Sequence, residues 1–178
     1  MIALGVDRAG TYYRVFKPDW SDPLDASFAK TFGGRWTPRG ELGAVYLNAT
    51  IEVSAANARL QHRRRAIGLF DLRPEKRPSL LDVRVPRHLV GDVVTSAGIA
   101  AAGLPSDYPI GVSHASCWAA ARAAYADTRI AGIACRSAAE CTATYCAGEE
   151  LAWFDRAKPV ARIQERTFAR WYPGPYPH

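Results

Sequence analysis

Hydrophobic residues along the chain gather into short runs separated by polar residues, glycine and proline. Runs of this length, rich in aromatic and β-branched residues and bounded by turn-forming residues, are typical of strands. The predicted strands cover residues 11–16, 43–47, 66–72, 80–85, 90–95, 130–136 and 151–155. The tail from 160 to 172 alternates only weakly, and we expect residues 173–178 to fray.

A helical period appears in two longer segments. Thr50 is a suitable N-cap for a helix over residues 51–64, and the apolar spacing within 116–126 predicts a second helix. A short helical segment near 24–30 precedes residues 33–40, which contain too much glycine and proline for regular structure. Several strands with few helices favour a mixed α+β domain over a doubly wound parallel sheet. No G-x-G-x-x-G follows a strand and no Walker loop is present, which disfavours those two modes of nucleotide binding.

The 178 residues carry a net charge of +6, from 23 basic and 17 acidic side chains. Such a balance steers the chain towards anions without selecting one. The densest basic run, 62–65, ends the first long helix, where cations complement the helix dipole in solvent; an anion-binding or partner surface is the alternative. The other arginines are dispersed among acids and no nucleic-acid motif is visible, so direct nucleic-acid binding is disfavoured.

The chain contains neither a membrane-spanning run of about 18 apolar residues nor a signal peptide at its beginning, so we expect a cytoplasmic protein with no membrane partner. Four cysteines, Cys117, Cys135, Cys141 and Cys146, lie in the second half without C-x-x-C spacing, and the histidines are scattered. This pattern predicts buried free thiols and no metal site.

The densest candidate for chemistry is the sequence Gly33-Gly34-Arg35-Trp36. Glycines allow close backbone approach to a ligand, an arginine fork holds phosphate oxygens and an indole stacks on a planar ring, so the combination suits a dinucleotide. A turn with an exposed arginine and a core tryptophan is equally compatible with these four residues. Tyr46 ends an apolar strand, and Ser137 directly follows the strand 130–136.

These motifs occur in an order that resembles the RES domain, the toxin half of RES–Xre toxin–antitoxin pairs. The similarity runs through 12–15, 33–40, 44–47, 131–137 and 151–155. It implies a fold like that of ADP-ribosyltransferases, with a split, strongly bent sheet and NAD in the cleft. It also implies cleavage of the nicotinamide–ribose bond by water or phosphate, with NAD as substrate, no true cofactor and no metal. The implied protein partner is an Xre-like antitoxin, and a homo-oligomer stays open.

The resemblance also assigns roles to residues. Arg35, Tyr46 and Ser137 match the family's arginine, tyrosine and serine, whereas Asn57 occupies the glutamate position and Asn48 replaces a usual serine. The implied catalytic residues are Arg35, Tyr46, Asn57 and Ser137. The implied NAD-binding residues are Gly34, Arg35, Trp36, Tyr46, Asn48 and Ser137, with Trp36 and Tyr46 packing against nicotinamide.

Asn57 can keep hydrogen bonds to a ribose but not a negative charge. Glu52 is the nearest carboxylate in sequence, but five helical residues turn a side chain by about 500°, or roughly 140° net, so it does not share a face with Asn57. Three readings therefore stay open: an NAD-cleaving toxin, an ADP-ribosyltransferase acting on a protein, and a degenerate binding module without catalysis. We expect one domain over 1–178, with a core at 11–156 and a C-terminal extension at 157–178.

Overall fold

The computed structural model describes residues 4–141 and 146–174. Its regular elements, in chain order, are β1 (Gly5–Phe16), α1 (Ser27–Phe32), β2 (Ala44–Asn48), α2 (Ile51–His62), β3 (Ser79–Val93), α3 (Ser96–Ala101), α4 (His114–Ala126), β4 (Gly132–Arg136), β5 (Glu149–Phe154), β6 (Ala161–Arg166) and α5 (Phe168–Trp171), with two 3₁₀ turns, Leu69–Asp71 and Pro74–Lys76, before β3. The mixed α+β composition predicted from the sequence is confirmed. None of the helices in the described ranges is long and apolar enough to cross a membrane.

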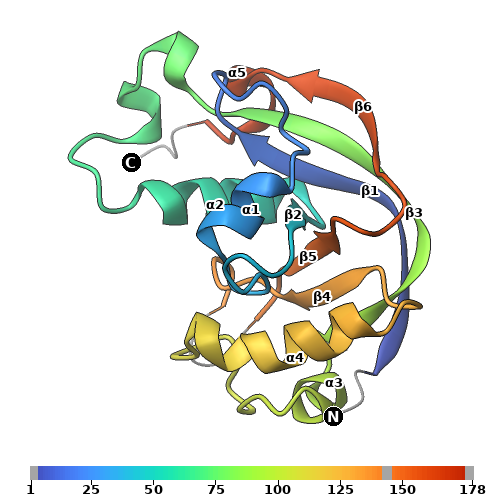
Figure 1. Ribbon diagram of the computed structural model, residues 1–178. Helices are drawn as coiled ribbons and strands as arrows, with labels where there is room; N and C mark the ends of the chain where they lie inside the picture. The colour runs from blue at the N-terminus through green and yellow to red at the C-terminus, as the bar shows by residue number, and fades with distance from the viewer. Residues whose placement is uncertain (1–3, 142–145, 175–178) are drawn as a thin grey trace.

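The described strands form one six-stranded sheet in the order β1-β2-β5-β4-β3-β6, and β1 also pairs with β3. The second pairing closes five strands into a ring. The sixth strand, β6, pairs with the first half of β3, on the same edge that carries β4 further along. Figure 1 shows β1 and β3 as long curved strands along one side, with α3 and α4 at one end and α1 and α2 beside β2. The closed sheet corrects the split sheet expected from the resemblance. Closure is possible because β1 pairs with β3 along its length and still meets β2 at Tyr13 and Asn48.

Two predicted strands, 80–85 and 90–95, are one continuous strand, β3. Pro86 suggests a break because proline cannot donate to a ladder. The register with β1 shifts between Arg8 and Gly10, opposite His88 and Val85, so Pro86 falls at a β-bulge where no ladder bond is required.

The prediction of a strand over 66–72 is wrong. Residues Leu69–Asp71 form a 3₁₀ turn, and the Asp71 carboxylate accepts a hydrogen bond from the Gly68 amide at 2.8 Å. A local side-chain bond of this kind competes with strand pairing.

The two long helices are confirmed to within a few residues at their ends. The Val53 amide donates to Thr50 Oγ1 at 3.2 Å, so Thr50 caps α2 as predicted. α4 starts at His114, slightly earlier than expected, with Ser113 as its cap. The short helix α3 was not predicted, whereas α1 lies close to the expected short helix.

Side chains alternate between the two faces of the sheet and build a core on each face, and a third, smaller core lies between α2, β3 and α5. Val45 and Leu47 of β2 pack with Leu151 and Trp153 of β5 on one face. Ala44 of β2, Ala152 and Phe154 of β5 and Ile133 of β4 pack on the other face against the buried residues of α3 and α4. The segment expected as an extension also packs: β6 pairs with β3, and Phe168 and Trp171 of α5 are buried.

Candidate functional site

Strand register brings polar side chains together at one end of the face that also packs against α4. Asn48 of β2 lies opposite Glu150 of β5, which lies opposite Cys135 of β4. Directly paired residues project from the same face of a sheet, and Ser137 follows Cys135 by two positions. Asn48, Glu150 and Cys135 therefore lie on one face, two positions beyond Tyr46, Ala152 and Ile133. Ser137 follows just past the end of β4, two positions further along the same face.

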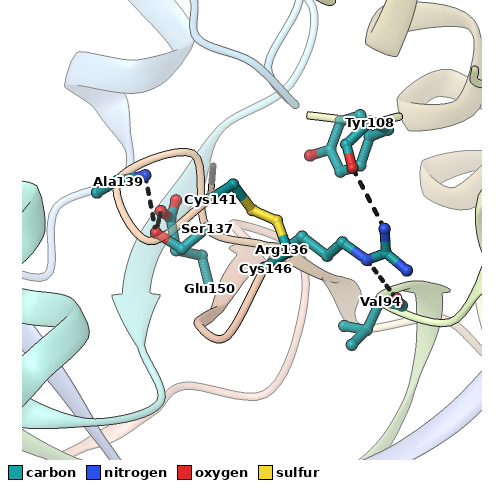
Figure 2. Close-up of a disulfide and its surroundings, with 8 residues drawn as sticks. All are labelled: Val94, Tyr108, Arg136, Ser137, Ala139, Cys141, Cys146 and Glu150. Carbon is teal, nitrogen blue, oxygen red and sulfur yellow. Dashed lines mark hydrogen bonds between the residues drawn. A yellow bond between two sulfur atoms is a disulfide. The ribbon is translucent and has the colours of Figure 1, made fainter. Parts of the chain in front are cut away.

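Hydrogen bonds join these residues to Asn57 of α2. Asn57 Nδ2 donates to Asn48 Oδ1 at 2.6 Å and to Glu150 Oε1 at 3.0 Å. Ser137 Oγ donates to the same Glu150 oxygen at 2.6 Å and accepts from the Ala139 amide at 3.2 Å, as Figure 2 shows in part. We call Asn48, Asn57, Ser137 and Glu150 the polar cluster. Three of its members were predicted as site residues, and the structure brings all three together.

The fourth member, Glu150, was missed by sequence reasoning. The available signal was its position immediately before a predicted core strand, but only strand pairing shows that this strand end meets Ser137. Glu52, the nearest carboxylate in sequence to Asn57, is exposed on α2 and is not part of the cluster. This agrees with the rotation argument that separates Glu52 from Asn57.

Exposure divides the polar cluster into two pairs. Ser137 is 0% exposed and Asn48 is 7% exposed, whereas Asn57 and Glu150 are half-buried. Buried Asn48 therefore holds Asn57, and buried Ser137 holds Glu150, each through a hydrogen bond to a partner that reaches the surface. In this arrangement Ser137 would not contact a ribose directly, as the resemblance implies, but would act on it by holding Glu150.

Arg35 lies in a tight turn that Tyr46 organises. Within the turn, the Gly34 amide donates to the Thr37 carbonyl at 2.9 Å, and the Trp36 amide donates to Tyr46 Oη at 3.0 Å. A Cβ on Gly34 would lie 2.7 Å from Tyr46 Oη, so only glycine fits there. Trp118 Nε1 of α4 donates to the Gly34 carbonyl at 3.0 Å and ties the turn to the helix.

The Arg35 guanidinium lies over the Tyr108 ring, 5.8 Å from its centroid. Among the described residues, buried Arg35 Nη1 and buried Tyr108 Oη have no hydrogen-bond partner, and Arg35 has no acidic partner. Burial and the Arg35 charge together lower the pKa of His114. Arg35 is half-buried, and a buried guanidinium nitrogen without an acceptor or a counter-ion is an unusual arrangement that an anionic ligand would complete.

Tyr46 and Trp36 differ in how far they can reach a ligand. Burial, with a smaller contribution from Glu150, raises the pKa of Tyr46 to about 12, so its hydroxyl is protonated at neutral pH. Trp36 is fully buried, and its Nε1 donates to Cys135 Sγ at 3.1 Å. The structure thus places the Trp36 indole in the core, which was the alternative to a stacking role that the sequence left open. A fully buried indole has no surface for a ligand to contact.

The cysteines follow the sequence prediction only in part. Cys117 and Cys135 are buried free thiols as expected, but Cys141 and Cys146 form a disulfide beside Ser137 and Glu150 (Figure 2). An antiparallel bridge sets these two Cα atoms 4.1 Å apart, a closeness that their spacing in sequence did not reveal. The described residues contain no cluster of three or more potential metal ligands.

A separate groove of about 920 Å³ lies at the C-terminal end of α2. Basic and aromatic side chains line it, among them Lys17, Trp20, His62, Arg64 and Arg65. Neither Arg35 nor any member of the polar cluster contributes to its wall. The basic run that ends α2 therefore faces this groove and not the candidate site.

Comparison with solved structures places the fold in a known class. A chain of a solved structure, "Crystal structure of the M.tuberculosis MbcT-MbcA toxin-antitoxin complex", superposes with a TM-score of 0.73 at 21% sequence identity, covering 91% of this chain and 85% of that chain. The RES domain model matches residues 11–173, so the chain belongs to the RES domain family. No curated protein sequence matches the chain.

Proposed function

We propose that this RES domain protein binds NAD and cleaves its nicotinamide–ribose bond, and that it acts as the toxin of a toxin–antitoxin pair. The observation that carries the proposal is the buried, unpartnered Nη1 of Arg35 on the sheet face that bears the polar cluster. NAD supplies a pyrophosphate for such a cation and a ribose for such a cluster. Family membership supports the same substrate class.

Chemically, the bond between ribose C1′ and the pyridinium nitrogen breaks, and its electron pair goes to that nitrogen. Nicotinamide leaves as a neutral molecule, so the step requires no general acid. The sugar becomes oxocarbenium-like, and a water or phosphate oxygen then bonds to C1′ while one proton passes to solvent. The work left to the protein is to hold NAD and to stabilise the developing positive charge.

Each site residue has a role in this scheme. Arg35 binds phosphate oxygens through its guanidinium, and Tyr46 packs against nicotinamide. Asn57 hydrogen-bonds the ribose, with Asn48 holding its amide in place. Ser137 acts by fixing Glu150.

The partner is proposed from the same comparisons. The similar solved chain comes from a toxin–antitoxin complex, and we propose that an Xre-type antitoxin likewise restrains this chain. Such a partner would keep the site from depleting NAD in the cell that makes it.

Nicotinamide release from NAD tests the proposed activity. We expect the purified full chain to release nicotinamide, measured by chromatography with and without phosphate, and Arg35→Ala to lower the rate by about 10²–10³-fold, because it removes a preorganised charge. Arg39→Ala is the matched control, since Arg39 is exposed and donates only to the Thr31 carbonyl. A folded wild type that releases no nicotinamide would contradict the proposal. Labelled NAD that marks a protein in a cell extract would assign transfer to protein instead.

A further inference from the structure

We propose that Glu150 is the catalytic carboxylate of this site and that it faces the ribose from β5. The inference rests on the proposed function and adds to it the residue that stabilises the oxocarbenium charge. It starts from one contact: Glu150 Oε1 lies 3.0 Å from Nδ2 of Asn57, the residue at the position where the resemblance places a glutamate. The site therefore contains a negative charge, but a residue of β5 supplies it and not the residue at position 57 of α2.

The Glu150 carboxylate is held in one orientation. Its Oε1 accepts hydrogen bonds from Ser137 Oγ at 2.6 Å and from Asn57 Nδ2 at 3.0 Å. Two donors from different elements, the end of β4 and the middle of α2, fix the group before any ligand arrives. Preorganisation of this kind is what makes electrostatic stabilisation effective, because the protein does not reorganise as charge develops.

The charge of Glu150 is also not neutralised nearby. Both donors are neutral, and no described basic side chain forms an ion pair with Glu150. Its neighbour Glu149 projects from the other face of β5 and is bound by Arg8 at 2.7 Å and by Tyr12 at 3.1 Å. Of these two adjacent carboxylates, only Glu150 brings a net negative charge to the polar cluster.

The half-buried position of Glu150 fits a group that meets substrate. As the C1′–nitrogen bond breaks, positive charge spreads over C1′ and the ring oxygen of the ribose. A carboxylate beside that ring attracts this charge and orients the attacking water, which then loses its proton to solvent. Carboxylates serve the same purpose in glycoside cleavage.

This arrangement also gives a reason for Asn57. A glutamate at position 57 would put a second carboxylate within hydrogen-bond distance of Glu150, where two like charges cannot both ionise easily. An amide instead donates to Glu150 and leaves one charge in the site. We therefore expect Asn57→Glu alone to lower turnover at neutral pH.

The test compares nicotinamide release and NAD binding across matched variants of the full chain. Glu150→Gln keeps an acceptor for Ser137 and Asn57 but removes the charge, so we expect NAD binding to persist while kcat falls by about 10²–10³-fold. Glu149→Gln removes the same charge on the opposite face and should keep wild-type turnover. The double variant Glu150→Gln with Asn57→Glu returns a single carboxylate to the cluster and should recover part of the lost turnover.

The outcomes separate this inference from the proposed function. An active wild type together with an equally active Glu150→Gln would overturn the role of Glu150 alone. Loss of turnover in Glu150→Gln with no recovery in the double variant would also overturn it, provided that thermal unfolding shows both variants folded. A folded wild type without nicotinamide release overturns the proposed function itself, and the catalytic role of Glu150 with it.

Discussion

Adjacent residues on one strand can have unrelated roles, and the pair Glu149 and Glu150 is the clearest case. Side chains alternate along β5, so Glu149 meets Arg8 and Tyr12 on one face while Glu150 meets Asn57 and Ser137 on the other. Neither residue type nor position in sequence distinguishes the two. The face of the sheet decides which carboxylate pairs with Arg8 and which joins the polar cluster of the candidate site.

Gly34 is required for a different reason, the close approach of Tyr46. Replacing Gly34 by alanine would place Cβ 2.7 Å from Tyr46 Oη and 2.8 Å from Thr37 Oγ1. We expect Gly34→Ala to lower the free energy of unfolding by about 1–3 kcal/mol, as overpacking commonly does, and to reduce nicotinamide release because the turn carrying Arg35 shifts. Chemical denaturation and the release assay measure both effects. Gly174→Ala is the control, since nothing lies within 4 Å of its Cβ; equal stability of the two variants would refute the steric argument.

At the scale of elements, one buried carboxylate adds to the backbone pairing that holds β6 to β3. Asp82 of β3 accepts from Arg166 Nε at 2.9 Å and Nη2 at 2.6 Å, and from Gln164 Nε2 at 2.8 Å. The hydrogen bonds from Arg166 lower the pKa of Asp82, although burial opposes the shift. A C-terminal strand expected as an extension is thereby fastened to the core.

We expect Asp82→Asn to lower the free energy of unfolding at neutral pH by about 1–3 kcal/mol, because an amide cannot accept all of these donors. A carboxyl whose pKa is lowered in the folded state stabilises it above the unfolded pKa, near 4, and loses that contribution as pH falls through the folded pKa. The difference between wild type and Asp82→Asn should therefore shrink in acid. Urea denaturation at several pH values measures it.

Asp22→Asn is the control for this prediction. It removes another carboxylate paired with β6, at Arg162, but both partners of that pair are about half exposed (52% and 54%). Exposed pairs contribute little, so its effect should be smaller than that of Asp82→Asn. A larger loss of stability in Asp22→Asn would contradict the assignment of Asp82 as the residue that fastens β6.

Over the whole molecule, the net charge of +6 does not form one basic surface. Arginines pair with acids across the described part of the chain at 2.6–2.7 Å, namely Arg8, Arg87, Arg122, Arg129, Arg162 and Arg166. A basic run at the end of α2 lines a groove, whereas Arg35 lies away from that groove, on the sheet face that bears the polar cluster. Total charge is therefore a poor guide to the candidate site.

This distribution predicts weak affinity for nucleic acid. We expect binding to duplex DNA at 0.15 M salt to be weaker than a Kd of about 10⁻⁴ M, the weak end of ordinary non-specific binding, because locally paired arginines release few counterions. Fluorescence anisotropy with a labelled duplex measures the affinity. Micromolar binding that weakens steeply with added salt would show that the charge is organised for nucleic acid after all.

The sequence by itself determined the local structure. Periodicity located both long helices, Thr50 indicated where α2 begins, and most strands lie near their predicted positions, because these features depend on neighbours in the chain. The order of motifs likewise indicated the RES family and pointed to Arg35, Asn57 and Ser137. Local pattern failed at Pro86, where a β-bulge in β3 accommodates the proline, and at 66–72, where a side-chain hydrogen bond closes a turn.

Only the tertiary structure decided the closed sheet and the composition of the site. Pairing of β1 with both β2 and β3 depends on which strands meet. Strand register brings Glu150 to Ser137, and the packing of α2 beside the sheet brings Asn57 to Glu150. Burial then assigned Trp36 to the core and left the Arg35 Nη1 without a described partner. These are properties of residues far apart in sequence, and a local pattern does not contain them.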